Sequence, residues 1–273
     1  MPDRLLDVVS TWPVPHASAA VLRNGSVAAR CGDSEFPYRL ASLSKMITAW
    51  ATLIACEEGV VSLDDEVGPA TLRHLLAHAA GYGFDGETPI MGPGKRRIYS
   101  NTGIETAAAH VAKQADMPFD RYLREAVFEP LGMTSSELRG SAAFAVWSTL
   151  DDTCRFLSEL MRPTLVSADT ARDATTVQFP ELGGVVPGLG SFRPCPWGLG
   201  IEIRGEKWPH WTGSRNSPRT FGHFGGSGTM AWVDPAIDVG LVALTDRDFD
   251  QWPAEALAAW SSLSDAVVDW ARS

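Results

Sequence analysis

The alternation of apolar and polar residues predicts strands near both ends of the chain and helices between them. Residues 17–31 form two short apolar runs around Asn24-Gly25, a dipeptide that tolerates the positive φ angles of a tight hairpin. Near the other end, "GLGIEIRG", "SGTMAWVDP" and "DVGLVALTD" alternate or stay apolar between turn residues, as antiparallel strands do. From residue 63 to about 196 the pattern changes to short helical stretches interrupted by glycine and proline.

These elements predict a fold that combines an α/β lobe with an all-α lobe. Because strands occur at both termini, we expect one antiparallel sheet formed from N- and C-terminal segments and flanked by helices, with a helical lobe inserted. The expected boundaries are residues 1–62 and 197–273 for the α/β lobe and 63–196 for the helical lobe, in one compact unit. A helix is predicted from about Ser42 to Glu58, and a closing helix at the C-terminus.

Composition and charge narrow the class of protein. The chain has 273 residues, of which 45% are hydrophobic and 21% charged, as expected for a folded globular protein. A net charge of -10 disfavours nucleic acid and anionic membranes as partners. Asp3 and Asp7 interrupt the apolar core that a signal peptide needs, and no run reaches membrane-spanning length, so we expect a cytoplasmic protein. The basic stretch "GPGKRR" at residues 92–97 is interpreted as a solvated turn, and the oligomeric state is open.

Residues 42–45 form an S-x-x-K motif at the start of a predicted helix. Positions i and i+3 share a helix face, so the Lys45 amine can reach the Ser42 hydroxyl. A serine becomes a good nucleophile when a base removes its proton, and lysine is such a base only in its neutral form. Partial burial and the positive end of the helix dipole both favour that form. The alternative is an exposed lysine at a helix entry; Ser44 is no rival nucleophile, because Ile47 stands three residues after it.

Tyr99-Ser100-Asn101 follows a loop rich in glycine and proline and opens a predicted helix. A tyrosine hydroxyl near Lys45 can shuttle a proton from Ser42, and the Asn101 amide can hold Lys45 or a substrate carbonyl. The alternative is a tyrosine packed at a loop, with Asn101 capping the helix.

A glycine-rich stretch, "FGHFGGSGTMAWVDP", covers residues 221–235. Gly225, Gly226 and Gly228 remove side chains from one strand edge, where a backbone N–H can then approach a ligand closely. His223 places a titratable ring beside that edge. The alternative is a glycine-rich strand end before an ordinary hairpin.

Taken in order, these motifs resemble those of the serine beta-lactamase and penicillin-binding-protein superfamily, and within it the class C beta-lactamase-like branch of esterases, DD-peptidases and beta-lactamases. The middle motif here is Y-S-N and the last is H-F-G, where relatives carry S-D-N and K-T-G. The resemblance extends from about residue 17 to the C-terminus through "SLDDEV", "LRHLLAHAAGY", "VFEPLGM", "WSTLDDTCRFLSEL" and "WGLGIE". It implies a two-lobed fold with the active site in the seam.

The resemblance also implies roles for residues of this chain. Ser42 would be the nucleophile, Lys45 its base and Tyr99 a proton relay. The backbone N–H groups of Ser42 and Gly226 would form the oxyanion hole. The implied substrate contacts are Asn101, His223, Phe224 and Gly225.

The function that the resemblance implies is a serine hydrolase that forms an acyl-enzyme with a small-molecule ester or amide. Relatives that hydrolyse beta-lactams usually carry a lysine at the position of His223, which helps to hold the carboxylate of the drug, whereas histidine is mostly neutral at pH 7. We therefore expect an esterase-like activity without a cofactor. Two alternatives stay open: a beta-lactamase or D-alanyl-D-alanine-type peptidase, and a catalytically silent binding or regulatory homologue.

Two other kinds of site have weaker support. His74 and His78 are spaced i, i+4 on a predicted helix, as in zinc proteases, but Leu75 stands where those enzymes carry a glutamate. The cysteines are far apart and form no CxxC pair, so no metal site is expected. "GGSGT" places Ser227 in part of a G-x-S-x-G motif, but Thr229 replaces the last glycine.

Overall fold

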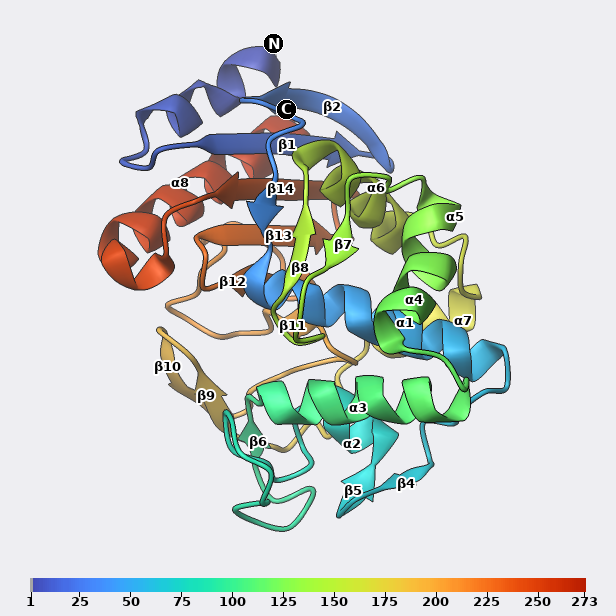
Figure 1. The fold of residues 1–273 in the computed structure, drawn as a ribbon. Coiled ribbons are helices and arrows are strands. Elements are labelled where there is room, and N and C mark those ends of the chain that lie inside the picture. The colour runs from blue at the N-terminus through green and yellow to red at the C-terminus, as the bar shows by residue number, and fades with distance from the viewer. Residues whose placement is uncertain (1) are drawn as a thin grey trace.

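The computed structural model describes residues 2–273, with side chains from Arg4 onward. Its centre is a six-stranded antiparallel sheet with the order β11-β12-β13-β14-β1-β2. The strands are β1 (Ala17–Arg23), β2 (Ser26–Cys31), β11 (Glu202–Ile203), β12 (Phe221–Gly225), β13 (Thr229–Asp234) and β14 (Val239–Thr245). β1 pairs with β14 along its whole length, so the two ends of the chain join in one sheet (Figure 1). This confirms the predicted fold class.

The predicted hairpin and C-terminal strands are present, and one strand is shorter than predicted. The turn between β1 and β2 has φ angles of +53° at Asn24 and +78° at Gly25, as expected for this dipeptide. Within "GLGIEIRG" only the two residues of β11 pair with β12. Gly200 and Gly205, on either side, have φ angles of +70° and +55°, which turn the chain out of an extended conformation.

Helices cover both faces of the sheet (Figure 1). One face packs against α8 (Pro253–Arg272), and the other against α1 (Ser44–Glu57) and α6 (Leu150–Met161). Successive residues of a strand point to opposite faces, so Trp232 of β13 packs toward α8 while Ala231 packs toward α1 and α6. The buried Trp232 indole N–H donates to Ser264 Oγ of α8 at 3.0 Å, which satisfies its one polar group.

Between the two halves of the sheet, helices supply more of the regular structure than the short strands do. The remaining helices of the chain are η1 (Pro2–Thr11), η2 (Ala41–Leu43), α2 (Leu72–Leu76), α3 (Asn101–Gln114), α4 (Phe119–Leu123), η3 (Arg124–Phe128), α5 (Glu129–Leu131), α7 (Ala168–Ala174) and η4 (Phe249–Gln251). The remaining strands are β3 (Tyr38–Arg39), β4 (Glu66–Val67), β5 (Ala70–Thr71), β6 (Arg97–Ile98), β7 (Glu137–Leu138), β8 (Val146–Ser148), β9 (Gly184–Val186) and β10 (Gly190–Phe192). The predicted lobe boundaries near residues 62 and 197 stay a prediction.

Over residues 2–273, no helix combines the length and the apolar character needed to cross a membrane.

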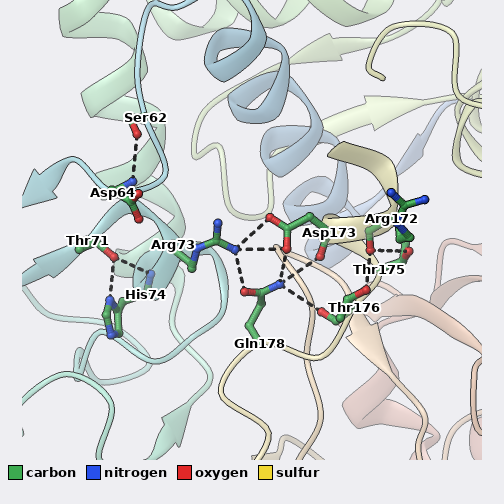
Figure 2. Close-up of polar contacts among 10 residues, drawn as sticks. All are labelled: Ser62, Asp64, Thr71, Arg73, His74, Arg172, Asp173, Thr175, Thr176 and Gln178. Carbon is green, nitrogen blue, oxygen red and sulfur yellow. Dashed lines mark hydrogen bonds and ion pairs between the residues drawn. The ribbon is translucent and has the colours of Figure 1, made fainter. Parts of the chain in front are cut away.

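One polar network ties α2 to α7 and to the chain that follows it (Figure 2). Arg73 donates to the Asp173 carboxylate at 3.0 Å and to Gln178 Oε1 at 2.8 Å. The Gln178 amide donates back to Asp173 Oδ1 at 3.0 Å, and its backbone N–H donates to Trp197 O at 2.8 Å. The Arg73 and Asp173 side chains are 29% and 39% exposed, so water weakens their attraction. The network therefore adds little to the free energy of unfolding and mainly holds α2 and α7 in place relative to each other. It fixes the segment that lies against Trp197.

The basic stretch at residues 92–97 is only partly a solvated turn. Lys95 and Arg96 are exposed, but Arg97 is 1% exposed and begins β6. Its guanidinium donates to the backbone carbonyls of Ala77, Gln178 and Cys195. Burial lowers the pKa of Arg97 to about 10. The predicted exposure is therefore wrong for Arg97, because its partners come from segments that are distant in sequence.

Arg97→Ala is expected to lower the free energy of unfolding by about 3 kcal/mol or more, because several buried carbonyls lose a charged hydrogen-bond donor. Urea unfolding followed by tryptophan fluorescence measures the change. Arg96→Ala, at the exposed neighbour, is the matched control and should stay within about 0.5 kcal/mol of the parent. Equal unfolding midpoints for the two variants would contradict the structural role of Arg97.

Candidate active site

Ser42 lies in the short 3-10 turn η2, and α1 begins two residues after it rather than at Ser42 as predicted. Ala41, just before it, has a φ of +47°, a left-handed conformation that costs a non-glycine residue about 1–2 kcal/mol. The β12–β13 hairpin supports this turn. Thr229 Oγ1 donates to Leu40 O at 2.9 Å, and a Cβ at Gly225 would stand 2.4 Å from the same oxygen. Glycine at position 225 therefore lets the hairpin hold the turn that carries the serine.

Lys45 is fully buried, with its amine beside Ser42. Its Nζ lies 2.7 Å from Asn101 Oδ1, 3.0 Å from Ala143 O and 3.1 Å from Ser42 Oγ. Amide and carbonyl oxygens only accept hydrogen bonds, so two N–H bonds of the amine point to Asn101 and Ala143. The remaining tetrahedral position of the Lys45 nitrogen faces Ser42. It holds a hydrogen when Lys45 is an ammonium ion and the lone pair when Lys45 is neutral. A neutral Lys45 is therefore aimed at the serine hydroxyl.

Burial lowers the pKa of Lys45 to about 7, because the ammonium form loses its hydration. The carboxylates of Glu105 and Asp85 oppose this shift. The N-terminus of α1 adds partial positive charge near the amine and also disfavours the ammonium form. Both protonation states are populated near neutral pH, as the predicted base requires.

The Tyr99-Ser100-Asn101 motif stands against the same amine. Ser100 is the N-cap of α3, and its Oγ accepts from Gly103 N at 3.0 Å. Asn101 is the first residue of the helix, and its amide bonds Lys45 through Oδ1 and Asp85 through Nδ2, the latter at 3.0 Å. The alternative in which Asn101 caps the helix is therefore wrong.

Tyr99 is buried among aromatic rings above the amine. The nearest rings are those of His78, Trp197 and His223, with centroids 4.8, 5.7 and 5.6 Å away. Burial raises the pKa of the Tyr99 phenol above its usual range, and the neighbouring Ser42 hydroxyl offsets part of that rise. Tyr99 therefore keeps its proton at neutral pH. Lys45 Nζ lies 4.7 Å from the centroid of its ring, so the structure brings Ser42, Lys45 and Tyr99 together.

His223 on β12 supplies no positive charge at neutral pH. Its Nδ1 lies 2.6 Å from Phe224 O, and because a carbonyl only accepts, Nδ1 carries the proton and Nε2 is an acceptor. Among the described residues Nε2 has no hydrogen-bond partner. Burial, with a contribution from the nearby Lys45, lowers the pKa of His223 to about 4.

A cavity of about 390 Å³ opens beside these residues. The predicted site residues that line it are Ser42, Tyr99, His223, Phe224 and Gly226. No described atom lies within 4 Å of a Cβ built at Gly226, so that position faces open space. Lys45, Asn101 and Gly225 are buried and do not line the cavity. An oxyanion hole formed by Ser42 and Gly226, and substrate contacts by the other residues, stay predictions.

Most of the remaining cavity wall comes from residues that the motifs did not indicate. The apolar part includes Phe84, Val186, Trp197, Phe249 and Pro253. Two acidic residues, Glu202 and Asp250, also line the cavity. Trp197 and Glu202 fall in "WGLGIE", one of the stretches that carry the resemblance, so a signal for them existed. Phe84 and Asp250 lie in segments without periodicity, which gave no signal.

Glu202 carries a buried charge that is compensated inside the protein. Its Oε1 lies 2.8 Å from Lys207 Nζ and 3.2 Å from His210 Nε2, and its Oε2 accepts from Trp211 Nε1 at 2.7 Å. Burial alone would raise the pKa of Glu202, but Lys207 and His210 outweigh it and hold that pKa well below its usual range. The carboxylate therefore fixes the cavity wall and offers no free charge to a ligand.

The predicted pairing of His74 with His78 on one helix is wrong, because α2 ends at Leu76. His74 Nδ1 lies 2.7 Å from Thr71 Oγ1, and Figure 2 shows this contact. His78 has a φ of +55°, and its ring packs on Tyr99. In the part of the chain that the structure describes, no group of three or more His, Cys, Asp or Glu is placed to hold a metal ion.

The two other serines near the site have structural hydrogen bonds. Ser44 Oγ accepts from Val146 N at 3.0 Å, and Ser227 Oγ donates to the backbone carbonyl of Arg39. Both side chains are buried. Of these three serines, Ser42 is the one that lines the cavity.

Comparison with known proteins matches one protein family over most of the chain. A family model described as Beta-lactamase matches residues 11–263. A solved beta-lactamase from Mycobacterium bovis is 49% identical, with a TM-score of 0.95 over 98% of this chain and 99% of that chain. A beta-lactamase from Yersinia enterocolitica is 23% identical over 83% of this chain and 77% of its own length. The octameric penicillin-binding protein homologue from Pyrococcus abyssi shares the fold, with 20% identity and a TM-score of 0.70 over 89% of this chain and 71% of its own.

Lys45 is expected to titrate near pH 7 in the folded protein, whereas the ordinary pKa of a lysine side chain is 10.5. A carbon NMR titration of the lysine Cε signals measures this, with Lys45→Met to identify the resonance and Lys95→Met, at an exposed position, as the control. The unfolded state binds more protons between pH 7 and 10.5, so the Lys45 contribution to stability grows as pH rises through that window. A Lys45 signal that titrates at the ordinary pKa of lysine would contradict the buried amine.

Proposed function

The chain belongs to the beta-lactamase family, and we propose that it is a serine hydrolase that acts on a small, uncharged ester or amide through an acyl-enzyme. The observation that carries the proposal is the Lys45 amine, 3.1 Å from Ser42 Oγ, with two of its N–H bonds taken by neutral oxygens. In its neutral form this amine can accept the proton of Ser42 as the serine attacks.

In the acylation step, Ser42 Oγ attacks the substrate carbonyl carbon while its proton moves to Lys45 Nζ. The negative charge that develops on the carbonyl oxygen is stabilised by the backbone N–H groups of Ser42 and Gly226. Tyr99 is protonated, so its phenol donates a proton to the leaving alcohol or amine, and the proton held by Lys45 restores the phenol. The bond to the leaving group breaks, and the acyl group stays on Ser42.

Deacylation uses the same groups in reverse. Neutral Lys45 lies beside the acylated serine and accepts a proton as water attacks; the Tyr99 hydroxyl can relay it by passing its own proton to Lys45 while it takes the proton of the water. Glu202, the buried carboxylate of the cavity wall, is held by Lys207 and His210 and is not free to serve as this base. The proton then returns to Ser42 Oγ as the acid is released.

The charge of the cavity supports an uncharged substrate. Its lining, over the residues that the structure describes, contains no lysine or arginine, and His223 is neutral at pH 7. The exposed Asp250 adds a negative charge to the lining. A substrate carboxylate would lose hydration here without gaining a cation. The apolar rings of Phe84, Trp197 and Phe249 instead suit an apolar acyl or leaving group.

A beta-lactamase or D-alanyl-D-alanine-type peptidase is the second candidate. It is favoured by the relative from Mycobacterium bovis, which is 49% identical and is named a beta-lactamase. Beta-lactam drugs carry a carboxylate, and among the described residues no lysine or arginine lines the cavity to pair with it. This counts against the second candidate. A catalytically silent homologue has the least support, because Ser42, Lys45 and Tyr99 are assembled around one cavity.

The proposed substrate is a small molecule, because the cavity of about 390 Å³ matches a small ligand. A cytoplasmic location stays a prediction. It is supported by the cysteines, all four of which are free thiols, as expected in a reducing compartment.

A fluorophosphonate probe is expected to label the parent protein on Ser42, because Lys45 activates that hydroxyl. Ser42→Ala should abolish the adduct, read by intact-mass spectrometry, together with hydrolysis of nitrophenyl esters. Lys45→Met should reduce ester turnover by about 10²-fold or more, the size of general-base help. Ser62→Ala, at an exposed serine beyond the opposite end of α1, is the control and should be labelled like the parent. An unlabelled parent, or a labelled Ser42→Ala protein, would overturn the proposal.

Nitrophenyl butyrate is expected to be a better substrate than nitrophenyl hemisuccinate, an ester of similar length that carries a carboxylate. The ratio of kcat/KM should be about tenfold or more, since an unpaired carboxylate entering an apolar cavity costs over about 1.4 kcal/mol. Added salt should narrow the gap if part of it is repulsion by Asp250. Faster turnover of the hemisuccinate, or of nitrocefin, than of the butyrate would reverse the substrate assignment in favour of the second candidate.

A further inference from the structure

We propose that Asp85, in the loop between α2 and β6, is a positioning residue that orients the Asn101 amide and thereby aims the neutral Lys45 amine at Ser42. The inference rests on the proposed hydrolase function. It concerns an exposed residue that no sequence motif indicates. Its neighbour Phe84 lines the cavity, so the same loop reaches both the substrate space and the base.

The Asn101 side chain has two chemically different ends, and each has one partner. Nδ2 donates to Asp85 Oδ1 at 3.0 Å, and Oδ1 accepts from Lys45 Nζ at 2.7 Å. An ionised carboxylate only accepts hydrogen bonds, so it can bond the nitrogen end of the amide but not the oxygen end. The opposite orientation would set two acceptor oxygens against each other. Asp85 therefore selects the orientation that is observed.

This orientation decides where the lone pair of a neutral Lys45 points. With the Asn101 oxygen facing the amine, one N–H is used there, a second is used on Ala143 O, and the lone pair is left for Ser42. With the Asn101 nitrogen facing the amine, the lone pair of Lys45 would accept that N–H instead. The base would then have to break a hydrogen bond before it could take the serine proton.

The second acceptor of Lys45 needs no such control. Ala143 O is a backbone carbonyl, and the turn that carries it is held by a hydrogen bond from Ala143 N to Ser141 Oγ at 3.1 Å. Ser141 Oγ in turn donates to Glu105. A backbone carbonyl keeps its direction with the chain, whereas a side-chain amide rotates about a broad, two-fold torsion. Asn101 is thus the acceptor whose direction depends on a partner.

The loop also acts on the base through charge. Asn101 N donates to Phe84 O at 2.8 Å, so the loop holds Asn101 at two points. The titratable groups that face Lys45 are Asp85, Glu105, His78, Tyr99 and His223. Burial holds both histidines neutral and the tyrosine protonated, so Asp85 and Glu105 are the charges that stabilise the ammonium form.

Two substitutions separate orientation from charge. Asp85→Asn removes the charge but keeps a side-chain oxygen that can accept from Asn101, so the plateau of kcat/KM on a nitrophenyl ester should stay within about twofold of the parent. Asp85→Ala removes the charge and the accepting oxygen, and the plateau of kcat/KM should fall about tenfold or more. In both variants the acid limb of the pH profile should move to lower pH by about half a unit, because Lys45 loses a nearby negative charge. Glu87→Ala, at another exposed acidic residue of the loop, should change neither quantity.

An Asp85→Ala protein with the parental plateau would overturn the orienting role. A loss of activity with an unmoved acid limb in both variants would mark a merely structural loop and would also overturn the proposal. Failure of the hydrolase function itself is seen separately, as a parent protein that takes no fluorophosphonate adduct. The carbon NMR titration then still decides: the Lys45 pKa must be lower in Asp85→Asn than in the parent, and equal values would overturn the inference.

Discussion

Burial of one amine beside one hydroxyl is the constraint on which the rest of the site depends. An ammonium group inside a protein loses hydration, and a carboxylate in direct contact would restore much of that loss but would also hold the proton on lysine. The direct contacts of Lys45 are neutral oxygens instead. Glu105 and Asp85 stand behind those oxygens, where they moderate the pKa without fixing the charge. The amine is therefore buried and still able to change protonation state near neutral pH.

The fold supplies this arrangement from segments that are distant in sequence. The turn before α1 brings Ser42, and the start of α3 brings Asn101. The β12–β13 hairpin contacts the turn through Thr229, and its His223 ring lies beside that of Tyr99. The hairpin belongs to a sheet packed by helices on both faces, so it is a rigid support. The left-handed Ala41 lies where the hairpin contacts the turn, and Gly225 makes that contact possible. Backbone strain of this kind persists where the surroundings over-determine it, and here it lies next to the serine.

Local patterns predicted what depends on local geometry, and failed where tertiary contacts decide. The contact of Ser42 with Lys45 follows from an i, i+3 spacing, and the hairpin at Asn24 follows from turn chemistry, so both were accessible from the sequence. Serine and asparagine are equally good N-caps, so the sequence could not choose between Ser100 and Asn101. The burial of Arg97 and the contact of Asp85 with Asn101 depend on loops whose path no periodicity describes. Phe84 and Asp250 of the cavity wall likewise lie in segments that no periodicity describes.

The neutral histidine of the third motif bears on the charge around the base. A lysine at position 223 would place a second cation near Lys45, and repulsion between like charges would help to keep the Lys45 amine neutral. His223 is itself neutral, with its Nδ1 proton on a backbone carbonyl. The pKa of Lys45 is then set by burial on one side and by Asp85 and Glu105 on the other. The two carboxylates that oppose the effect of burial on Lys45 come from a surface loop, which carries Asp85, and from α3, which carries Glu105.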